Sequence, residues 1–337
     1  MTYPSPNFDY LHSLIGPYGV FEHAEHDRPR TEHGYCVDDV ARVLLVTARE
    51  IDPSPKVMDL ARMAVRFLEQ AQSIAGTFTN RRATSGRFIG RSTNEDCWGR
   101  AVWALGVSVT RCGDDDIKSR ASTLLQRSLV VRSPWPRSMA FATLGAVEVI
   151  KVDATAGDAL SLVQDATVVL DRPNVGDGWE WPEDRLSYAN AVLPEALMAA
   201  GSVLCNDRLV AIGLEQLRWL LSQESKLGRL SVTSSLGRHR SAGVESFDQQ
   251  PIEVAALCDA CARAFELTGD AKWLRGVELS ADWFLGKNDG GVVMFDPLTG
   301  GGYDGLTERG PNLNRGAEST LALLATLQTV RHAELVR

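Results

Sequence analysis

The chain has 337 residues, with 35 Lys and Arg against 43 Asp and Glu, and its net charge is −8 at pH 7. A nucleic-acid-binding surface needs clustered basic residues, so this balance predicts no nucleic-acid partner. No apolar run approaches the ~20 residues of a membrane-spanning helix, and residues 1–8 lack the basic and apolar parts of a secretion signal. We therefore expect a cytoplasmic protein without a membrane span, folded as one domain over residues 1–337.

Two kinds of helix alternate along the chain. One kind is apolar nearly all round and has to be covered on every side, whereas the other has a single apolar stripe and can face water. The first kind is predicted at 39–48, 97–109, 135–150, 188–204, 252–265 and 316–327. The second kind is predicted at 56–70, 117–129, 158–170, 207–222 and 270–285. This alternation predicts an all-α protein, an (alpha/alpha)6 toroid with an inner and an outer ring of helices.

The connections complete this picture. Six inner and five outer helices leave one inner helix unpaired, and we expect residues 7–15 to pack beside the last of them. Few stretches alternate with period two, so strands should be few and short. The long connections span 73–93, 173–187, 224–247 and 287–315, and loops of this length are often functional. We expect them to gather at one rim of the ring.

Acidic residues recur at the starts of the predicted inner helices. Because the inner helices of such a ring all point the same way, these starts converge on one funnel. A single carboxylate there is most simply a helix cap, but the doublets Asp38–Asp39 and Glu95–Asp96 exceed what one cap requires. Glycosidic cleavage uses two carboxyl groups and requires no cofactor. These four residues are therefore our catalytic candidates.

Aromatic and polar residues accompany the acids in the same connections. Aromatic faces cover the apolar face of a pyranose, and polar side chains pair with its hydroxyl groups. The sequence therefore predicts sugar contacts from His23, His33, Tyr35, Arg100, Trp179, Glu180, Trp181, Asn190, Asp248, Gln249, Gln250 and Glu318. For Trp179 and Trp181, a role as loop anchors is equally compatible with the pattern.

No metal or nucleotide site has a sequence signature. Cys258 and Cys261 form a CxxC without a second pair or a nearby histidine, so packing on one helix face is the simpler explanation. The six cysteines are expected to be free thiols. The chain has no GxGxxG after a strand, no GxxxxGK(S/T), no GxSxG and no HExxH. We predict neither a metal nor a cofactor.

Several segments resemble those of a known family. They are 33–42 (HGYCVDDVAR), 94–100 (NEDCWGR), 187–191 (SYANA), 247–253 (FDQQPIE) and 314–320 (NRGAEST). They are similar to segments of a bacterial family in the six-hairpin glycosidase-like superfamily, often encoded beside or fused to glycosyltransferases. The resemblance implies an (α/α)6 barrel, a carbohydrate-active role and a functional link to a glycosyltransferase. Asp38 and Asp39 also look like the adjacent catalytic aspartates of bacterial α-mannanases with a similar barrel.

The sequence thus predicts a glycoside hydrolase or phosphorylase acting on a short oligosaccharide or glycoconjugate, such as a mannoside. Two alternatives stay open. One is a sugar epimerase or isomerase that uses His23 or His33, which share the N-terminal loop with His26. The other is a non-catalytic sugar-binding partner of a glycosyltransferase. Histidines facing each other across a sugar would favour epimerisation, whereas carboxylates roughly 5 to 10 Å apart would favour hydrolysis.

Overall fold

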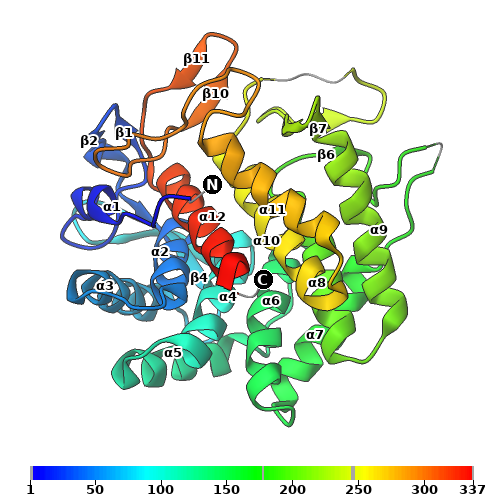
Figure 1. Cartoon of the computed structure of the whole chain (residues 1–337). Coiled ribbons are helices and arrows are strands. Elements are labelled where there is room, and N and C mark those ends of the chain that lie inside the picture. Colours follow the sequence, from blue (N-terminus) through cyan, green and yellow to red (C-terminus); the bar gives the residue numbers. More distant parts are fainter. Residues whose placement is uncertain (1–2, 177, 244–246, 336–337) are drawn as a thin grey trace.

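The computed structural model describes residues 3–176, 178–243 and 247–335, and helices form the body of the molecule (Figure 1). The inner ring consists of α2 (Val37–Arg49), α4 (Asp96–Arg111), α6 (Pro136–Val152), α8 (Val192–Val203), α10 (Pro251–Thr268) and α12 (Ala317–Leu335). Each of these helices packs against the next, and α12 packs against α2. The ring is therefore closed.

Each inner helix is backed by an outer helix. The outer ring consists of α3 (Pro55–Ala71), α5 (Asp115–Ser128), α7 (Gly157–Leu170), α9 (Asp207–Gln223) and α11 (Ala271–Phe284), each packed on the inner helix that precedes it. The short helix α1 (Asp9–Ser13) contacts α12 and supplies the sixth outer member. This arrangement confirms the predicted (α/α)6 toroid, including its closure by the N-terminal segment.

Small residues let the inner helices approach closely. The backbones of α4 and α6 are so near each other that a Cβ on Gly106 would collide with the carbonyl oxygen of Gly145. A Cβ on Gly99 would collide in the same way with the carbonyl oxygen of Ser138. Helices covered on every side need no outward polar stripe, and this is why their apolar residues run nearly all round.

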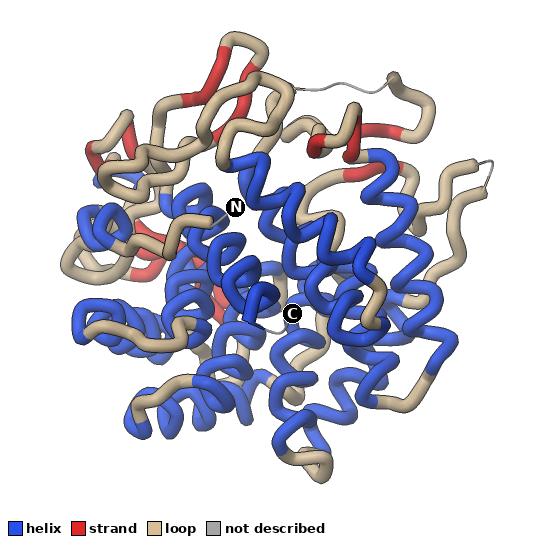
Figure 2. The backbone as a smooth tube through the Cα atoms, in the orientation of Figure 1, coloured by secondary structure: helices blue, strands red, loops and turns tan. Residues whose placement is uncertain are grey.

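The strands are short, antiparallel and confined to the connections (Figure 2). Three of them, β3 (Tyr35–Cys36), β4 (Phe78–Arg82) and β5 (Phe88–Thr93), form one small sheet. The two-stranded pairs are β1 (Ala24–Glu25) with β2 (Arg28–Pro29), β6 (Arg185–Leu186) with β9 (Arg238–His239), β7 (Ser225–Lys226) with β8 (Arg229–Leu230), and β10 (Gly305–Thr307) with β11 (Gly310–Asn312). The 3₁₀ helix η1 (Thr31–His33) precedes β3.

The long connections all join an outer helix to the next inner helix, so they lie at the N-terminal ends of the inner ring. Two backbone hydrogen bonds tie distant connections together, from the Arg315 N–H to the His26 carbonyl and from the Ala317 N–H to the Glu22 carbonyl. The hairpins β1–β2 and β10–β11 accordingly stand side by side in Figure 1. In the part of the chain that the structure describes, no helix is long and apolar enough to span a membrane.

The two largest differences from the predicted helix boundaries are at α8 and α12. Helix α8 begins at Val192 instead of residue 188, because the turn before it places Ala189 at a φ of 44°. The Glu253 carboxylate accepts hydrogen bonds from the backbone N–H groups of Ala189 and Asn190 and holds this turn. Helix α12 continues beyond residue 327 to Leu335 with a buried face that includes Val330.

Candidate functional site

Five of the six inner helices have no side-chain cap from their N-cap residue. Four of the five longer outer helices have a side-chain cap, supplied by Ser54, Asp114, Asn206 and Asp270. The N-cap residues of α2, α4, α6, α8 and α10 make no such bond. Helix capping therefore does not explain why carboxylates gather at the N-terminal ends of the inner helices.

A cavity of about 670 Å³ opens at these ends, between α2, α4, α12 and the loops above them. This volume falls in the range of ~300 to 1,000 Å³ that is typical of small-ligand sites. Among the residues predicted from the sequence, those that line it are His23, Asp38, Asp39, Asp96, Arg100, Gln250 and Glu318. Segments that are far apart in the chain therefore meet at one site, as the ring geometry predicts.

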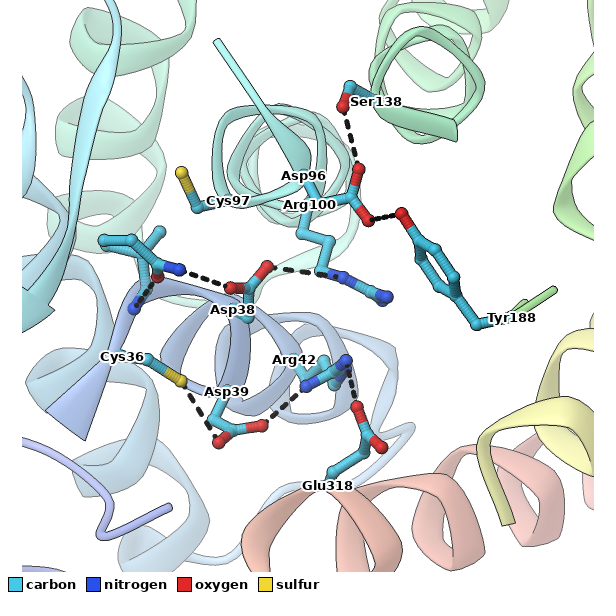
Figure 3. Close-up of polar contacts among 12 residues, drawn as sticks. Cys36, Asp38, Asp39, Arg42, Asp96, Cys97, Arg100, Ser138, Tyr188 and Glu318 are labelled. Atoms are coloured by element: carbon cyan, nitrogen blue, oxygen red, sulfur yellow. Dashed lines mark hydrogen bonds and ion pairs between the residues drawn. The ribbon is translucent and has the colours of Figure 1, made fainter. Parts of the chain in front are cut away.

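Asp38, in the first turn of α2, faces the cavity between two nitrogen donors (Figure 3). The Asn80 amide, from β4, donates a hydrogen bond of 2.8 Å to Oδ2. The Nε atom of Arg100 lies 3.5 Å from Oδ1. Arg100 is itself buried, and its guanidinium stacks 4.1 Å from the centroid of the Phe141 ring. These contacts fix the direction in which the Asp38 carboxylate points.

Asp96, in the first turn of α4, is held from two other elements (Figure 3). The Ser138 hydroxyl, on α6, donates to Oδ1 at 2.8 Å, and the Tyr188 hydroxyl donates to Oδ2 at 2.8 Å. Burial and the Asp96 charge raise the pKa of Tyr188, so its hydroxyl keeps its proton and remains a donor. Tyr188 thus directs a proton donor at the Asp96 carboxylate in the cavity wall.

The Asp39 carboxylate has a different environment from that of its neighbour Asp38. It is 2% exposed, pairs with Arg42 and accepts from the Cys36 thiol. Burial raises the pKa of Asp39 to about 6, and Arg42 opposes this rise. At pH 7 the ion pair is therefore intact. Arg42 also pairs with Glu318 on α12, so Asp39 links α2 to the last inner helix through this guanidinium.

Of two further candidates, one lines a neighbouring cavity and the other lines the cavity described above. Glu95 is exposed and lines only a neighbouring cavity of about 440 Å³, where Thr93 donates to it at 3.2 Å. Gln250 is partly buried and lines the larger cavity. Of the four catalytic candidates, Asp38 and Asp96 are the pair that lines both cavities.

Several predicted sugar contacts are buried in the protein core and line neither cavity. Tyr35 stacks on Phe21 with ring centroids 4.7 Å apart. Trp179 and Trp181 pack against Trp219 of α9, with centroid distances of 4.9 and 6.0 Å. Their aromatic faces are covered, so they anchor the loop before α8 instead of facing a ligand.

Other predicted contacts support the backbone or lie on the surface. Asn190 is fully buried and bonds to Glu253 and Arg137. Gln249 is also buried, and its side-chain oxygen accepts from the Trp283 indole at 2.9 Å. Glu180 and Asp248 are exposed and line neither cavity, because the cavity walls come from other segments.

The loop histidines do not face each other across the cavity. His23 lines it, and His33 packs edge-to-face on His23 with ring centroids 4.9 Å apart. His26 is exposed and has a positive φ of 52°. Within the described residues, His23 is the one histidine in the cavity wall.

One group of side chains has metal-ligand chemistry. A ligand atom from each of Glu22, Cys36 and Asp39 lies within 4.8 Å of the others. However, Arg81 pairs with Glu22 and Arg42 pairs with Asp39. Because guanidinium groups already neutralise both carboxylates, this arrangement is an ion-pair network and does not fit a cation.

The sequence did not single out several residues of the cavity wall. They are Glu22, Arg42, Asn80, Arg81, Asp304 and, above all, Tyr188. Tyr188 reaches the site because Arg137 donates to its carbonyl at 2.6 Å and packs against its ring. Asn80 and Arg81 arrive on β4, inside the long connection 73–93. The polar residues of that connection are the one sequence signal for them.

Comparisons with known proteins rest on the fold. No protein-family profile matches the chain, and no curated protein sequence matches it. A sugar epimerase from a ruminal bacterium superposes with a TM-score of 0.73 at 12% identity, covering 96% of this chain and 95% of that one. The cellobiose 2-epimerase of Spirochaeta thermophila superposes with a TM-score of 0.69 at 13% identity, covering 97% of this chain and 93% of that one.

A hydrolase shares the same architecture. The GH76 α-mannanase of Bacteroides thetaiotaomicron superposes with a TM-score of 0.65 at 10% identity, covering 97% of this chain and 94% of that one. Likeness at such low identity establishes the fold and leaves the reaction open. The closed double ring and these matches together show that the chain has the (α/α)6 toroid fold of these proteins.

Proposed function

We propose that the protein is a glycoside hydrolase that binds a short oligosaccharide or glycoconjugate at the inner-helix N-termini, with Asp38 and Asp96 as its catalytic carboxyl groups. The observation that carries this proposal is their shared position in the cavity walls. The two residues come from different helices, and each is oriented by neutral or cationic donors (Figure 3). Arg100 lies between them in the same wall.

The chemistry needs only these groups and water. One carboxyl group protonates the glycosidic oxygen as its bond to the anomeric carbon breaks. The other removes a proton from the attacking water, or first attacks the anomeric carbon itself and is then displaced by water. Asp39 has an indirect role in this scheme: its ion pair with Arg42 positions Glu318 at the cavity wall.

A sugar epimerase is the second candidate, and one observation favours it. His23 lines the cavity, and its Nε2 atom lies 3.7 Å from the Glu22 carboxylate. Epimerases are also among the proteins that share the fold. Epimerisation needs an acid–base group on each face of the sugar, and the described residues offer no second cavity histidine to provide one.

Product analysis separates these reactions. The purified protein would be incubated with mannosides, glucosides and arabinosides in deuterium oxide, with and without inorganic phosphate, and followed by NMR. Hydrolysis releases a free sugar without phosphate, whereas a phosphorylase requires phosphate and forms a sugar phosphate. An epimerase leaves the glycosidic bond intact and changes one stereocentre, with solvent deuterium entering at the exchanged carbon. Intact glycosidic bonds across the panel would contradict the hydrolase proposal.

A further inference from the structure

Two cavities meet at the candidate catalytic residues. The larger cavity of about 670 Å³ and the smaller one of about 440 Å³ share four wall residues, which are Asp38, Asn80, Asp96 and Tyr188. These side chains therefore form the boundary between two compartments, each large enough for a sugar ring. A bond that crosses this boundary would pass directly over the two aspartates.

The smaller cavity contains an exposed aromatic residue. Trp135 lies just before α6 and is 55% exposed, whereas the other seven tryptophans of the chain are buried or half-buried. Its backbone is fixed, because its carbonyl accepts from the Met139 N–H at 3.1 Å and its N–H donates to Ser133 Oγ at 3.2 Å. An exposed indole ring in the wall of a polar cavity is a surface on which another flat apolar face can stack.

The rest of the smaller cavity has the polar groups that sugar hydroxyls require. Glu183 lines it and makes a two-pronged pair with Arg137, with both N–O distances at 3.0 Å. Glu95 stands on the wall with one weak partner, and the Tyr188 hydroxyl reaches the boundary. Carboxylate oxygens accept from hydroxyl groups, and a pyranose presents both a ring of hydroxyls and an apolar face.

We propose that the smaller cavity is a second sugar-binding subsite, in which Trp135 stacks on a pyranose ring while Glu95 and Glu183 accept from its hydroxyls. This inference rests on the proposed function. It adds that the substrate spans at least two sugar units, one in each cavity. The bond that is cleaved joins them over Asp38 and Asp96.

Binding measurements test the subsite independently of turnover. Calorimetry would compare disaccharides of mannose, glucose and arabinose with the matching methyl monoglycosides, all in an Asp38→Asn background that blocks hydrolysis under the proposal. Trp135→Ala is expected to lower the affinity for a binding disaccharide about tenfold, since stacking buries much of one indole face. The affinity for the methyl glycoside should not change, and Trp135→Phe should retain most of the disaccharide affinity.

The outcomes separate the two proposals. Equal losses for disaccharide and methyl glycoside, no loss for either, or no disaccharide binding would each overturn the subsite. Disaccharide binding that depends on Trp135, in a wild-type protein that cleaves no glycoside, would retain the subsite and remove the hydrolase proposal. Hydrolysis of methyl glycosides and disaccharides with equal KM values that Trp135→Ala does not change would retain the hydrolase proposal and remove the subsite.

Discussion

The Tyr188 hydroxyl donates a hydrogen bond of 2.8 Å to the Asp96 carboxylate, although the two residues are 92 positions apart in the chain. The turn that carries Tyr188 is held by hydrogen bonds to the buried Glu253 carboxylate, which belongs to α10. Three inner-ring segments thus cooperate to aim one proton donor. The orientation of Asp96 is a property of the closed ring and not of its own helix.

Removal of the Tyr188 hydroxyl should lower the rate of the reaction. A hydrogen bond to a charged group contributes about 1.5–3 kcal/mol, so Tyr188→Phe should lower kcat/KM about tenfold to a hundredfold. Steady-state kinetics on the best glycoside of the panel would measure this change.

Tyr18→Phe is the matched control, because Tyr18 is also partly exposed but packs on Arg82, away from the cavity residues. The kcat/KM of this variant should match that of the wild type. A Tyr188→Phe enzyme with full activity would show that catalysis does not depend on this hydroxyl.

The buried Glu224 should make the protein less stable as the pH rises. Burial and the neighbouring Glu253 raise the pKa of Glu224 from 4.5 to about 8. The folded state therefore binds the proton more tightly than the unfolded state, and stability falls between about pH 4.5 and 8. Glu224→Gln removes this pH dependence because the amide side chain does not titrate. The amide oxygen can still accept the hydrogen bonds from Thr233.

Urea denaturation at pH 4.5 and pH 8 checks this effect. The free energy of unfolding of Glu224→Gln, relative to wild type, should be higher at pH 8 than at pH 4.5 by roughly 1–3 kcal/mol. Glu215→Gln, at an exposed position on α9, the helix that ends just before Glu224, should show no such difference. A Glu224→Gln variant with the same pH dependence as wild type would contradict the assigned shift.

Close contact between α4 and α6 predicts a strong effect of one methyl group. Gly106→Ala would drive its Cβ into the backbone of Gly145, and overpacking of this kind destabilises a protein by about 1–3 kcal/mol or more. Gly157→Ala, at the start of α7 with open space around the new Cβ, should instead be neutral or stabilising by about 0.5 kcal/mol. Chemical denaturation would measure both changes, and equal stability of the two variants would contradict this account of the packing.

The double ring of helices could be predicted from sequence because the apolar pattern that indicates it lies within each helix. A helix covered on all sides and a helix covered on one side have different compositions, and their alternation is visible without any contact information. The directions of the inner helices then follow from connectivity alone. The same reasoning correctly brought Asp38, Asp96 and Glu318 to one cavity.

Side-chain roles depended on contacts that the sequence does not display. Trp179 and Trp181 have the composition of a sugar platform, but Trp219 covers them. Trp135 and Tyr188 were assigned to helices, and their exposure at the cavity follows from the helix start at Pro136 and from the turn before α8. The predicted link to a glycosyltransferase and the cytoplasmic location stay predictions.

The central claim is that Asp38 and Asp96 together cleave a glycosidic bond. The most direct measurement is kcat on the best glycoside of the panel for Asp38→Asn, Asp96→Asn and the control Asp158→Asn, an exposed position at the start of α7. Loss of a general acid or base lowers a rate by about 10²–10⁴-fold, so both cavity variants should fall by this amount while remaining folded and the control should retain wild-type activity. Wild-type turnover by either folded cavity variant would contradict the assignment.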